Sequence, residues 1–193
     1  MKLNGSLFLK TKLHNLKKLN RAVFLDRDGV INRAIIKDGK PYAPTNLKEL
    51  EILQGVTKAL DALDKAGWLL IVVTNQPDVA RGKVKLAEVK LINKYLKERL
   101  PISRFYTCYH DNDDRCECRK PLPGSLLKAK KLQKINLYKS YMIGDRWSDI
   151  EAGNKVGCTT IFIDYNYNER LAKDFNYKAK SLFEAAKIIL EKN

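Results

Sequence analysis

Five short apolar runs along the chain predict β-strands. They lie at residues 22–25, 69–73, 105–107, 141–143 and 159–163. The run at 69–73 is continuously apolar and rich in β-branched residues, which is typical of a strand that is covered on both faces. The sequence therefore predicts a sheet with a buried interior.

Amphipathic segments between these runs predict helices. Val56, Leu60 and Leu63 recur at helical spacing, and Gly67 follows them as a stop signal. Similar patterns lie at residues 89–96, 126–132, 149–156 and 182–190. Because strands and helices alternate, we predict an α/β fold, with a Rossmann-like parallel sheet and helices on both of its faces.

Polar side chains directly follow three of the predicted strands. They are Asp26 and Asp28 after the first run, Thr74, Asn75 and Gln76 after the second, and Asp145 and Arg146 after the fourth. Ligands of open parallel sheets bind beyond the carboxyl ends of the strands. We therefore expect these side chains to converge on one site if the strands are neighbours.

The first of these groups indicates a metal. Asp26 and Asp28 are two positions apart in a segment that leaves a strand, so both can lean toward the same side. Two close carboxylates repel each other unless a cation lies between them, and Mg²⁺ is the usual hard cation for oxygen ligands. Alone, the stretch is also compatible with a polar Asp-Gly turn. A calcium loop is excluded, because Gly29 stands at the fourth position of the motif and Lys37 at the twelfth.

The last group lies at a predicted helix start. Ser148 and Glu151 match the spacing of a capping box, and Asp149 in the first turn would complement the helix dipole. Asp145 precedes the cap, so capping does not account for it. We therefore predict that Asp145 is the metal ligand of this segment.

Four residues with side chains that bind zinc lie close together in the sequence. They are Cys108, His110, Cys116 and Cys118. Their types suit a closed, tetrahedral Zn²⁺ site, although three reduced cysteines on a mobile loop are the alternative. Residues 111–115 are polar and could not become ordered by burial, so a metal would fix them and position Arg119 and Lys120. Cys158 lies far along the chain and is expected in the core.

Composition and charge limit the number of domains, the binding partners and the cellular location that we expect. The chain has 193 residues, enough for one domain with a full core, and a net charge of +15. Its lysines are dispersed, so a generally basic surface is favoured over a nucleic-acid groove. No apolar run could span a bilayer, and lysines interrupt the N-terminal segment as a signal peptide. We expect a cytoplasmic protein, where thiols stay reduced, acting as a monomer without membrane or nucleic-acid partners.

The motifs together resemble the haloacid dehalogenase superfamily of phosphotransferases. FLDRDGVIN, VVTNQ…ARG, CYH…CxCRKPxPG and IGDRWSDIEAG occur in that superfamily's order, over about residues 21–165. More narrowly, they resemble the D-glycero-D-manno-heptose bisphosphate phosphatases, to which the histidinol-phosphate phosphatases are related. The resemblance implies a phosphatase domain, which we place over residues 21–193; residues 1–20 precede the motifs and are expected to form a basic N-terminal extension. The short spacings from Asp28 to Asn75 and from Asn75 to Lys120 leave no room for a large cap domain.

The resemblance also implies a role for each residue. Asp26 would attack phosphorus and Asp28 would act as the acid and base, with Mg²⁺ held by Asp26, Asp145 and the Asp28 backbone carbonyl. The implied phosphate and substrate contacts are Thr74, Asn75, Gln76, Arg119, Lys120 and Arg146, and the implied zinc ligands are Cys108, His110, Cys116 and Cys118.

The substrate is less certain from sequence than the chemistry. Pro77-Asp78-Val79 stands where many relatives have Ser-Gly-Ile, and the flap (residues 32–42) has Asp38 as its only acid. A heptose bisphosphate, with the 7-phosphate removed, is the leading substrate. Histidinol phosphate, another small sugar phosphate and a nucleic-acid 3′-phosphate are alternatives, as is a zinc-stabilised binding module whose acids are incidental.

Overall fold

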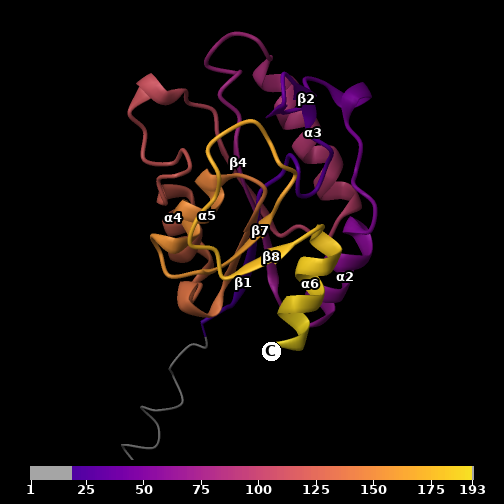
Figure 1. The fold of residues 1–193 in the computed structure, drawn as a ribbon, viewed down its shortest axis with the longest axis vertical. Helices are drawn as coiled ribbons and strands as arrows, with labels where there is room; N and C mark the ends of the chain where they lie inside the picture. Colours follow the sequence, from indigo (N-terminus) through magenta and orange to yellow (C-terminus); the bar gives the residue numbers. More distant parts are fainter. Residues whose placement is uncertain (1–18, 193) are drawn as a thin grey trace, which may run out of the picture.

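Continuous apolar runs form the central strands of a parallel sheet. The computed structural model describes residues 19–192. The strands are β1 (Ala22–Leu25), β4 (Leu69–Asn75), β5 (Arg104–Cys108), β6 (Tyr141–Gly144), β7 (Thr159–Ile163) and β8 (Tyr177–Ala179). Their order is β5-β4-β1-β6-β7-β8, and every neighbouring pair is parallel (Figure 1). The strand that leads to Asp26 therefore lies between those that lead to Thr74 and Asp145.

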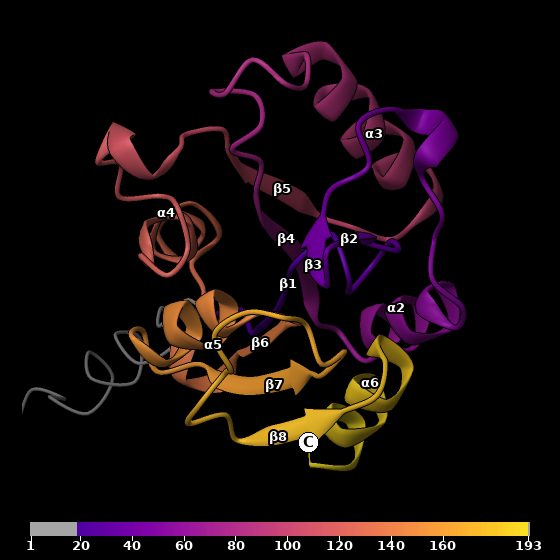
Figure 2. The ribbon, with the colours of Figure 1, turned by 45° about the horizontal axis from the view of Figure 1, so that its top comes forward.

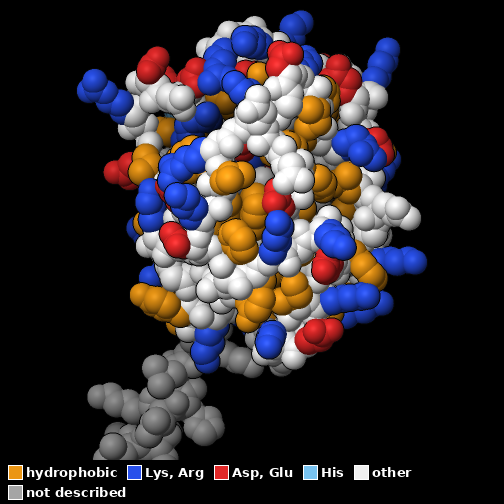
Figure 3. All heavy atoms as spheres, viewed as in Figure 1, with side chains coloured by type: hydrophobic (Ala, Val, Ile, Leu, Met, Phe, Trp, Pro, Cys, Tyr) orange, Lys and Arg blue, Asp and Glu red, His pale blue; other side chains and the backbone are white. Residues whose placement is uncertain are grey.

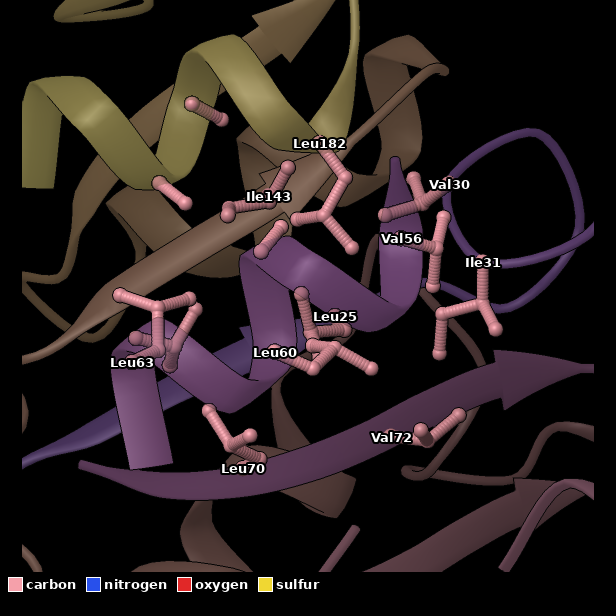
Figure 4. Close-up of a cluster of buried hydrophobic side chains, with 14 of the residues drawn as sticks. Leu25, Val30, Ile31, Val56, Leu60, Leu63, Leu70, Val72, Ile143 and Leu182 are labelled. Carbon is pink, nitrogen blue, oxygen red and sulfur yellow. The ribbon is translucent and has the colours of Figure 1, made fainter. Parts of the chain in front are cut away.

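Helices cover both faces of this sheet. Figure 2 shows α2 (Val56–Lys65), α3 (Leu86–Arg99) and α6 (Leu182–Glu191) on one side, and α4 (Gly124–Gln133) and α5 (Trp147–Asn154) on the other. Because side chains alternate along a strand, β1 supplies both cores. Val23 and Leu25 pack with α2 and α6, whereas Ala22 and Phe24 pack toward α4. Figure 4 shows Leu25, Leu60 and Leu182 meeting in the first of these cores.

The α/β prediction is confirmed, including the absence of a large cap domain. Between β1 and α2 the described chain holds only the hairpin of β2 (Ile35–Lys37) and β3 (Lys40–Tyr42) and the short 3-10 helix η1 (Leu47–Glu49). This hairpin is the predicted flap. The cysteine loop (residues 108–118) contains a second short helix, η2 (Asn112–Asp114), and η3 (Leu137–Lys139) precedes β6.

Two local predictions differ from the structure. Strand β8 was not predicted, because its sequence Tyr-Lys-Ala has no apolar run and it pairs only with β7 at the sheet edge. The proposed capping box of Ser148 and Glu151 is wrong: α5 begins at Trp147, and Asp149 Oδ2 accepts the Arg146 backbone N–H at 3.0 Å. The carboxylate that caps α5 is therefore Asp149, two residues before the Glu151 that the pattern favoured.

The predicted extension over residues 1–20 falls, up to residue 18, outside the described residues. Asn20 already belongs to the domain, because its backbone N–H donates to Lys134 O at 2.9 Å and it bridges to Ile135. In the face that Figure 3 presents, lysine and arginine side chains are dispersed between apolar and acidic ones. None of the described helices is both long and apolar enough to cross a membrane.

Candidate active site

The site lies where β1, β4 and β6 end side by side. Asp26 follows β1 directly, and its backbone N–H donates to Ile143 O of β6 at 2.9 Å. Asp145 follows β6 directly. Parallel pairing thus brings two carboxylates from distant parts of the sequence to one rim, as the sequence predicted.

Lys120 lies among the buried acids of this rim. Its Nζ atom lies 2.8 Å from Asp26 Oδ1 and 2.6 Å from Asp149 Oδ1, and it donates to Val73 O at 2.6 Å. All three charged side chains are at most 9% exposed. Lys120 is therefore held in place at the end of β4, which supports the prediction that it is a positioned rather than a solvated lysine.

Negative charge exceeds positive charge in this cluster. Asp26, Asp145 and Asp149 each offer an oxygen, and these oxygens lie within 4.8 Å of one another. Burial raises the pKa of Asp26 to about 6, although Lys120 lowers it and Asp149 and Asp28 add to the rise. Burial, followed by the charges of Asp26 and Asp149, raises the pKa of Asp145 well above its usual range. When all three carboxylates are ionised, the ammonium group of Lys120 offsets only one of their three negative charges.

These residues fit a hard divalent cation. Asp145 Oδ1 is buried and has no hydrogen-bond partner among the described residues, so it is available as a ligand. A group of close carboxylate oxygens at one rim is the donor set that Mg²⁺ prefers. Asp149 belongs to this set, whereas the sequence pattern had assigned it only to the helix dipole.

Asp28 is oriented by three neighbours. The fully buried Arg27 donates to both oxygens of Asp28 at 3.0–3.1 Å, and its Nη1 donates to Asn93 Oδ1 at 2.9 Å. Asn32 Nδ2 donates to Asp28 Oδ1 at 3.0 Å, and Gln76 Nε2 donates to Asp28 Oδ2 at 2.7 Å. These hydrogen bonds therefore fix the orientation of the Asp28 carboxyl group, which lines the cavity described below.

The polar residues at the end of β4 and directly after it serve partly to support other residues. Thr74 is buried, and its Oγ1 accepts from Gln76 Nε2 at 2.9 Å. Asn75 pairs twice with the Lys120 backbone: its Nδ2 donates to Lys120 O at 2.9 Å, and its Oδ1 accepts from Lys120 N–H at 3.1 Å. Gln76 thus orients Asp28 and Asn75 fixes the segment of Lys120, roles that the sequence did not indicate.

A cavity of about 310 Å³ opens above these residues. Its basic lining residues are Lys40, Arg81, Arg119, Lys120 and Arg146. Arg119 Nε donates to Asn112 Oδ1 at 2.9 Å, which aims its side chain along the cysteine loop. Arg146 pairs with Glu169 through Nε and Oε1 at 2.9 Å. The lining also includes Asp26, Asp28, Asp78 and Asp149, so the cavity is mixed in charge, and its arginines are the groups that can contact an anionic ligand.

The cysteine loop brings its four zinc-type ligands together. Cys108 Sγ lies 3.1 Å from Cys118 Sγ and 3.7 Å from Cys116 Sγ, and His110 Nδ1 lies 3.4 Å from Cys118 Sγ. In a tetrahedral site, Zn–S bonds of about 2.3 Å place sulfur atoms roughly 3.8 Å apart. The cluster can therefore hold zinc with small adjustments. Cys158 lies apart from it in the core, as expected.

Known proteins share both the sequence and the fold. A family model described as HAD-hydrolase-like matches residues 117–184. D-glycero-beta-D-manno-heptose-1,7-bisphosphate 7-phosphatases of Helicobacter pylori and Escherichia coli K12 are each 36% identical, over 69% and 68% of this chain and 78% and 72% of theirs. The chain belongs to the haloacid dehalogenase-like hydrolases.

A solved member of these hydrolases has the same fold. It is the D,D-heptose 1,7-bisphosphate phosphatase of B. bronchiseptica, determined with magnesium and phosphate. The two structures superpose with a TM-score of 0.78 at 25% identity, over 90% of this chain and 99% of the other. The prediction of a haloacid dehalogenase superfamily phosphatase is confirmed.

Besides Asn32 and Asp149, three further contributors to this hydrolase site were not predicted. Arg27 and Asn93 orient Asp28, and Tyr167 O–H donates to Asp145 Oδ2 at 2.9 Å. Arg27 occupies the middle position of Asp-Arg-Asp, where the pattern calls for no particular residue. Asn93 lies on the α3 face that packs inward, so a polar residue among its apolar positions was the available signal. Tyr167 lies in the polar segment between β7 and β8, where no sequence pattern indicated a site residue.

Gly29 provides a test of how closely the chain must approach Asp145. Its φ is +88°, and a Cβ atom there would lie 1.9 Å from Asp145 Oδ2. We expect Gly29→Ala to lower kcat/KM about 10- to 100-fold, because the added Cβ would displace Asp145, the predicted metal ligand, and disturbing a ligand's orientation typically costs about that much. Gly67→Ala is the matched control, since Gly67 has φ +81° with no atom within 4 Å of the added Cβ. It should cost about 1 kcal/mol of unfolding free energy from backbone strain, as measured by thermal denaturation, with activity retained. Equal activity of the two variants would contradict the prediction.

Proposed function

We propose that this hydrolase removes the 7-phosphate of D-glycero-D-manno-heptose 1,7-bisphosphate through an aspartyl-phosphate on Asp26. The observation that carries the chemistry is the buried cluster of Asp26, Lys120, Asp145 and Asp149 beside a cavity that Arg81, Arg119 and Arg146 also line. The names of the relatives support the substrate. We expect the protein to act in the cytoplasm, as a monomer.

In the first step, an Asp26 carboxylate oxygen attacks phosphorus and the bond from phosphorus to the sugar oxygen breaks. The leaving alkoxide takes a proton from Asp28, whose carboxyl group Arg27, Asn32 and Gln76 hold at the cavity wall. Splitting the displacement into two steps requires a carboxylate that can carry the phosphoryl group. In the second step, water attacks the phosphorus, Asp28 takes its proton, and inorganic phosphate leaves Asp26.

Positive charge must offset the charge on the phosphoryl oxygens in both steps. Lys120 supplies an ammonium group next to Asp26. Mg²⁺, held by Asp26, Asp145 and the Asp28 backbone carbonyl with Asp149 beside them, would supply the remaining charge. Thr74 and Asn75 end the neighbouring strand and are proposed to donate hydrogen bonds to the same oxygens.

The second phosphate of a bisphosphate needs its own cationic contacts. Arg119, Arg146 and Gln76 line the same cavity as Asp26, and Gln76 follows β4 directly. Arginine can grip a phosphate with two parallel hydrogen bonds, so these residues are proposed to orient the substrate. The cysteine loop, closed by Zn²⁺ on Cys108, His110, Cys116 and Cys118, would fix the backbone that leads into Arg119.

A panel assay of phosphate release tests this proposal. We expect preferential hydrolysis of the heptose bisphosphate with one phosphate released per molecule, slower hydrolysis of histidinol phosphate, and none of a 3′-phosphorylated oligonucleotide. Elemental analysis should find about one zinc per chain. Preference for the oligonucleotide, with steep salt dependence, would overturn the substrate assignment. Full activity of zinc-free protein would overturn the role of the cysteine loop.

A further inference from the structure

The segment between β7 and β8 contacts the carboxylate cluster of Asp26, Asp145 and Asp149 through the side chain of Tyr167. Tyr167 O–H donates to Asp145 Oδ2 at 2.9 Å. Asp145 is 2% exposed, so this oxygen is satisfied by protein rather than by solvent. Gly29 lies against the same oxygen, because a Cβ atom at Gly29 would stand 1.9 Å from Oδ2 but 3.2 Å from Oδ1. The two oxygens of Asp145 therefore have different surroundings.

The other oxygen, Asp145 Oδ1, is buried and has no hydrogen-bond partner among residues 19–192. A buried carboxylate oxygen without a partner is costly, so such atoms usually mark a place for an ion or water. Rotation of the carboxyl group would exchange the two oxygens. A hydrogen bond to Oδ2 opposes that rotation, so Oδ1 remains the oxygen without a partner among the described residues.

Tyr167 is itself held in position. Its ring stacks on Tyr165, with the two ring centroids 5.6 Å apart. The backbone N–H of Asn168 donates to Gly39 O, at the tip of the flap, at 2.8 Å. Glu169 accepts from Arg146 Nε at 2.9 Å. Because the segment is fixed on both sides of Tyr167, its hydroxyl can orient Asp145 without ordering a flexible loop first.

We propose that Tyr167 is a positioning residue that fixes Asp145 with Oδ1 as the cation ligand and thereby sets the affinity of the site for Mg²⁺. The inference rests on the proposed magnesium dependence. It assigns a role to a segment outside every motif that indicated the active site.

Titration calorimetry with Mg²⁺ on zinc-loaded protein tests the assignment directly. Partners that orient a metal ligand typically change affinity about 10- to 100-fold, so we expect Tyr167→Phe to weaken Mg²⁺ binding about 10-fold. Tyr165→Phe is the matched control: it removes the same atom from the stacked neighbour, whose hydroxyl makes no hydrogen bond among the described residues. It should bind Mg²⁺ within twofold of the unaltered protein.

Kinetics give a second readout. The Mg²⁺ concentration for half-maximal phosphate release should rise about 10-fold in Tyr167→Phe, while kcat at saturating Mg²⁺ stays within about threefold. Unchanged or tighter Mg²⁺ binding by Tyr167→Phe, with binding by the unaltered protein intact, would overturn this inference alone. Failure of the unaltered protein to bind Mg²⁺ would overturn the proposed metal dependence and this inference with it.

Discussion

Asp26→Asn should abolish phosphate release while the protein stays folded. The amide has the size of the carboxylate but cannot form the aspartyl-phosphate, so we expect kcat/KM to fall by about 10⁴-fold or more. Lys120 keeps its contacts with Asp149 Oδ1 and Val73 O, each at 2.6 Å. Steady-state assays at saturating Mg²⁺ measure the loss, and Asp61→Asn on the exposed face of α2 is the control. Retained activity would refute Asp26 as the nucleophile.

The same variant should lose activity but not stability. Burial raises the pKa of Asp26 to about 6, from 3.8. The folded state therefore binds more protons than the unfolded state between these values, and stability falls as pH rises through that window. Asparagine does not titrate, so metal-free Asp26→Asn should melt no lower than the unaltered protein at pH 8. A clearly lower melting temperature would mean that the charged carboxylate stabilises the empty site.

Replacing the buried lysine should damage both folding and catalysis. Lys120→Met leaves Asp26 and Asp149 without the cation that lies 2.8 and 2.6 Å from them. Removing one partner from a buried ion pair typically costs about 3–5 kcal/mol, and loss of a cation at the phosphoryl group typically costs about 10²- to 10³-fold in kcat. Denaturant unfolding and phosphate release measure the two losses. Lys128→Met, on the exposed side of α4, should change neither.

A double variant separates the two effects. Asp149→Asn removes one of the carboxylates that Lys120→Met leaves unpaired. The two substitutions together should therefore recover about 1–3 kcal/mol relative to the sum of the single effects, because the residues are in direct contact. Activity should stay low, since the ammonium group is still absent. Additive stabilities, or recovery of activity, would show that Lys120 does not act through these carboxylates.

The sequence predicted the central strands because their signal is strong and local. Residues 69–73 are apolar without interruption, and β4 buries them between two helical layers. It missed β8, whose three residues owe their pairing to the edge of β7 rather than to their own pattern. Parallel order explains why Asp26 and Asp145 meet, because β1 and β6 are neighbours. Lys120 comes instead from the segment after β5, a strand that β4 separates from β1, and the hydrogen bonds of Asn75 to its backbone hold it there.

The interactions that support the site were harder to predict than the reactive groups. Asp149 was indistinguishable in sequence from an ordinary first-turn acid, and only the packing of α5 shows that it reaches Lys120. Gln76 and Asn75 occupy a recognised motif, but their hydrogen bonds to Asp28 and to the Lys120 backbone depend on side-chain directions that spacing does not specify. Tyr167 depends on a 22-residue separation from Asp145 that no periodicity marks.

Residues 19–192 contain no large cap domain, so the reacting groups and the segments that border them belong to different parts of the fold. The reacting groups stand on strand ends whose positions are set by a core on each side of the sheet. The hairpin of β2 and β3 and the cysteine loop, by contrast, are surface segments that border the same cavity. These two segments line the cavity beside the reacting groups, so substitutions at their exposed positions can change which substrate is accepted while the residues at the strand ends stay the same.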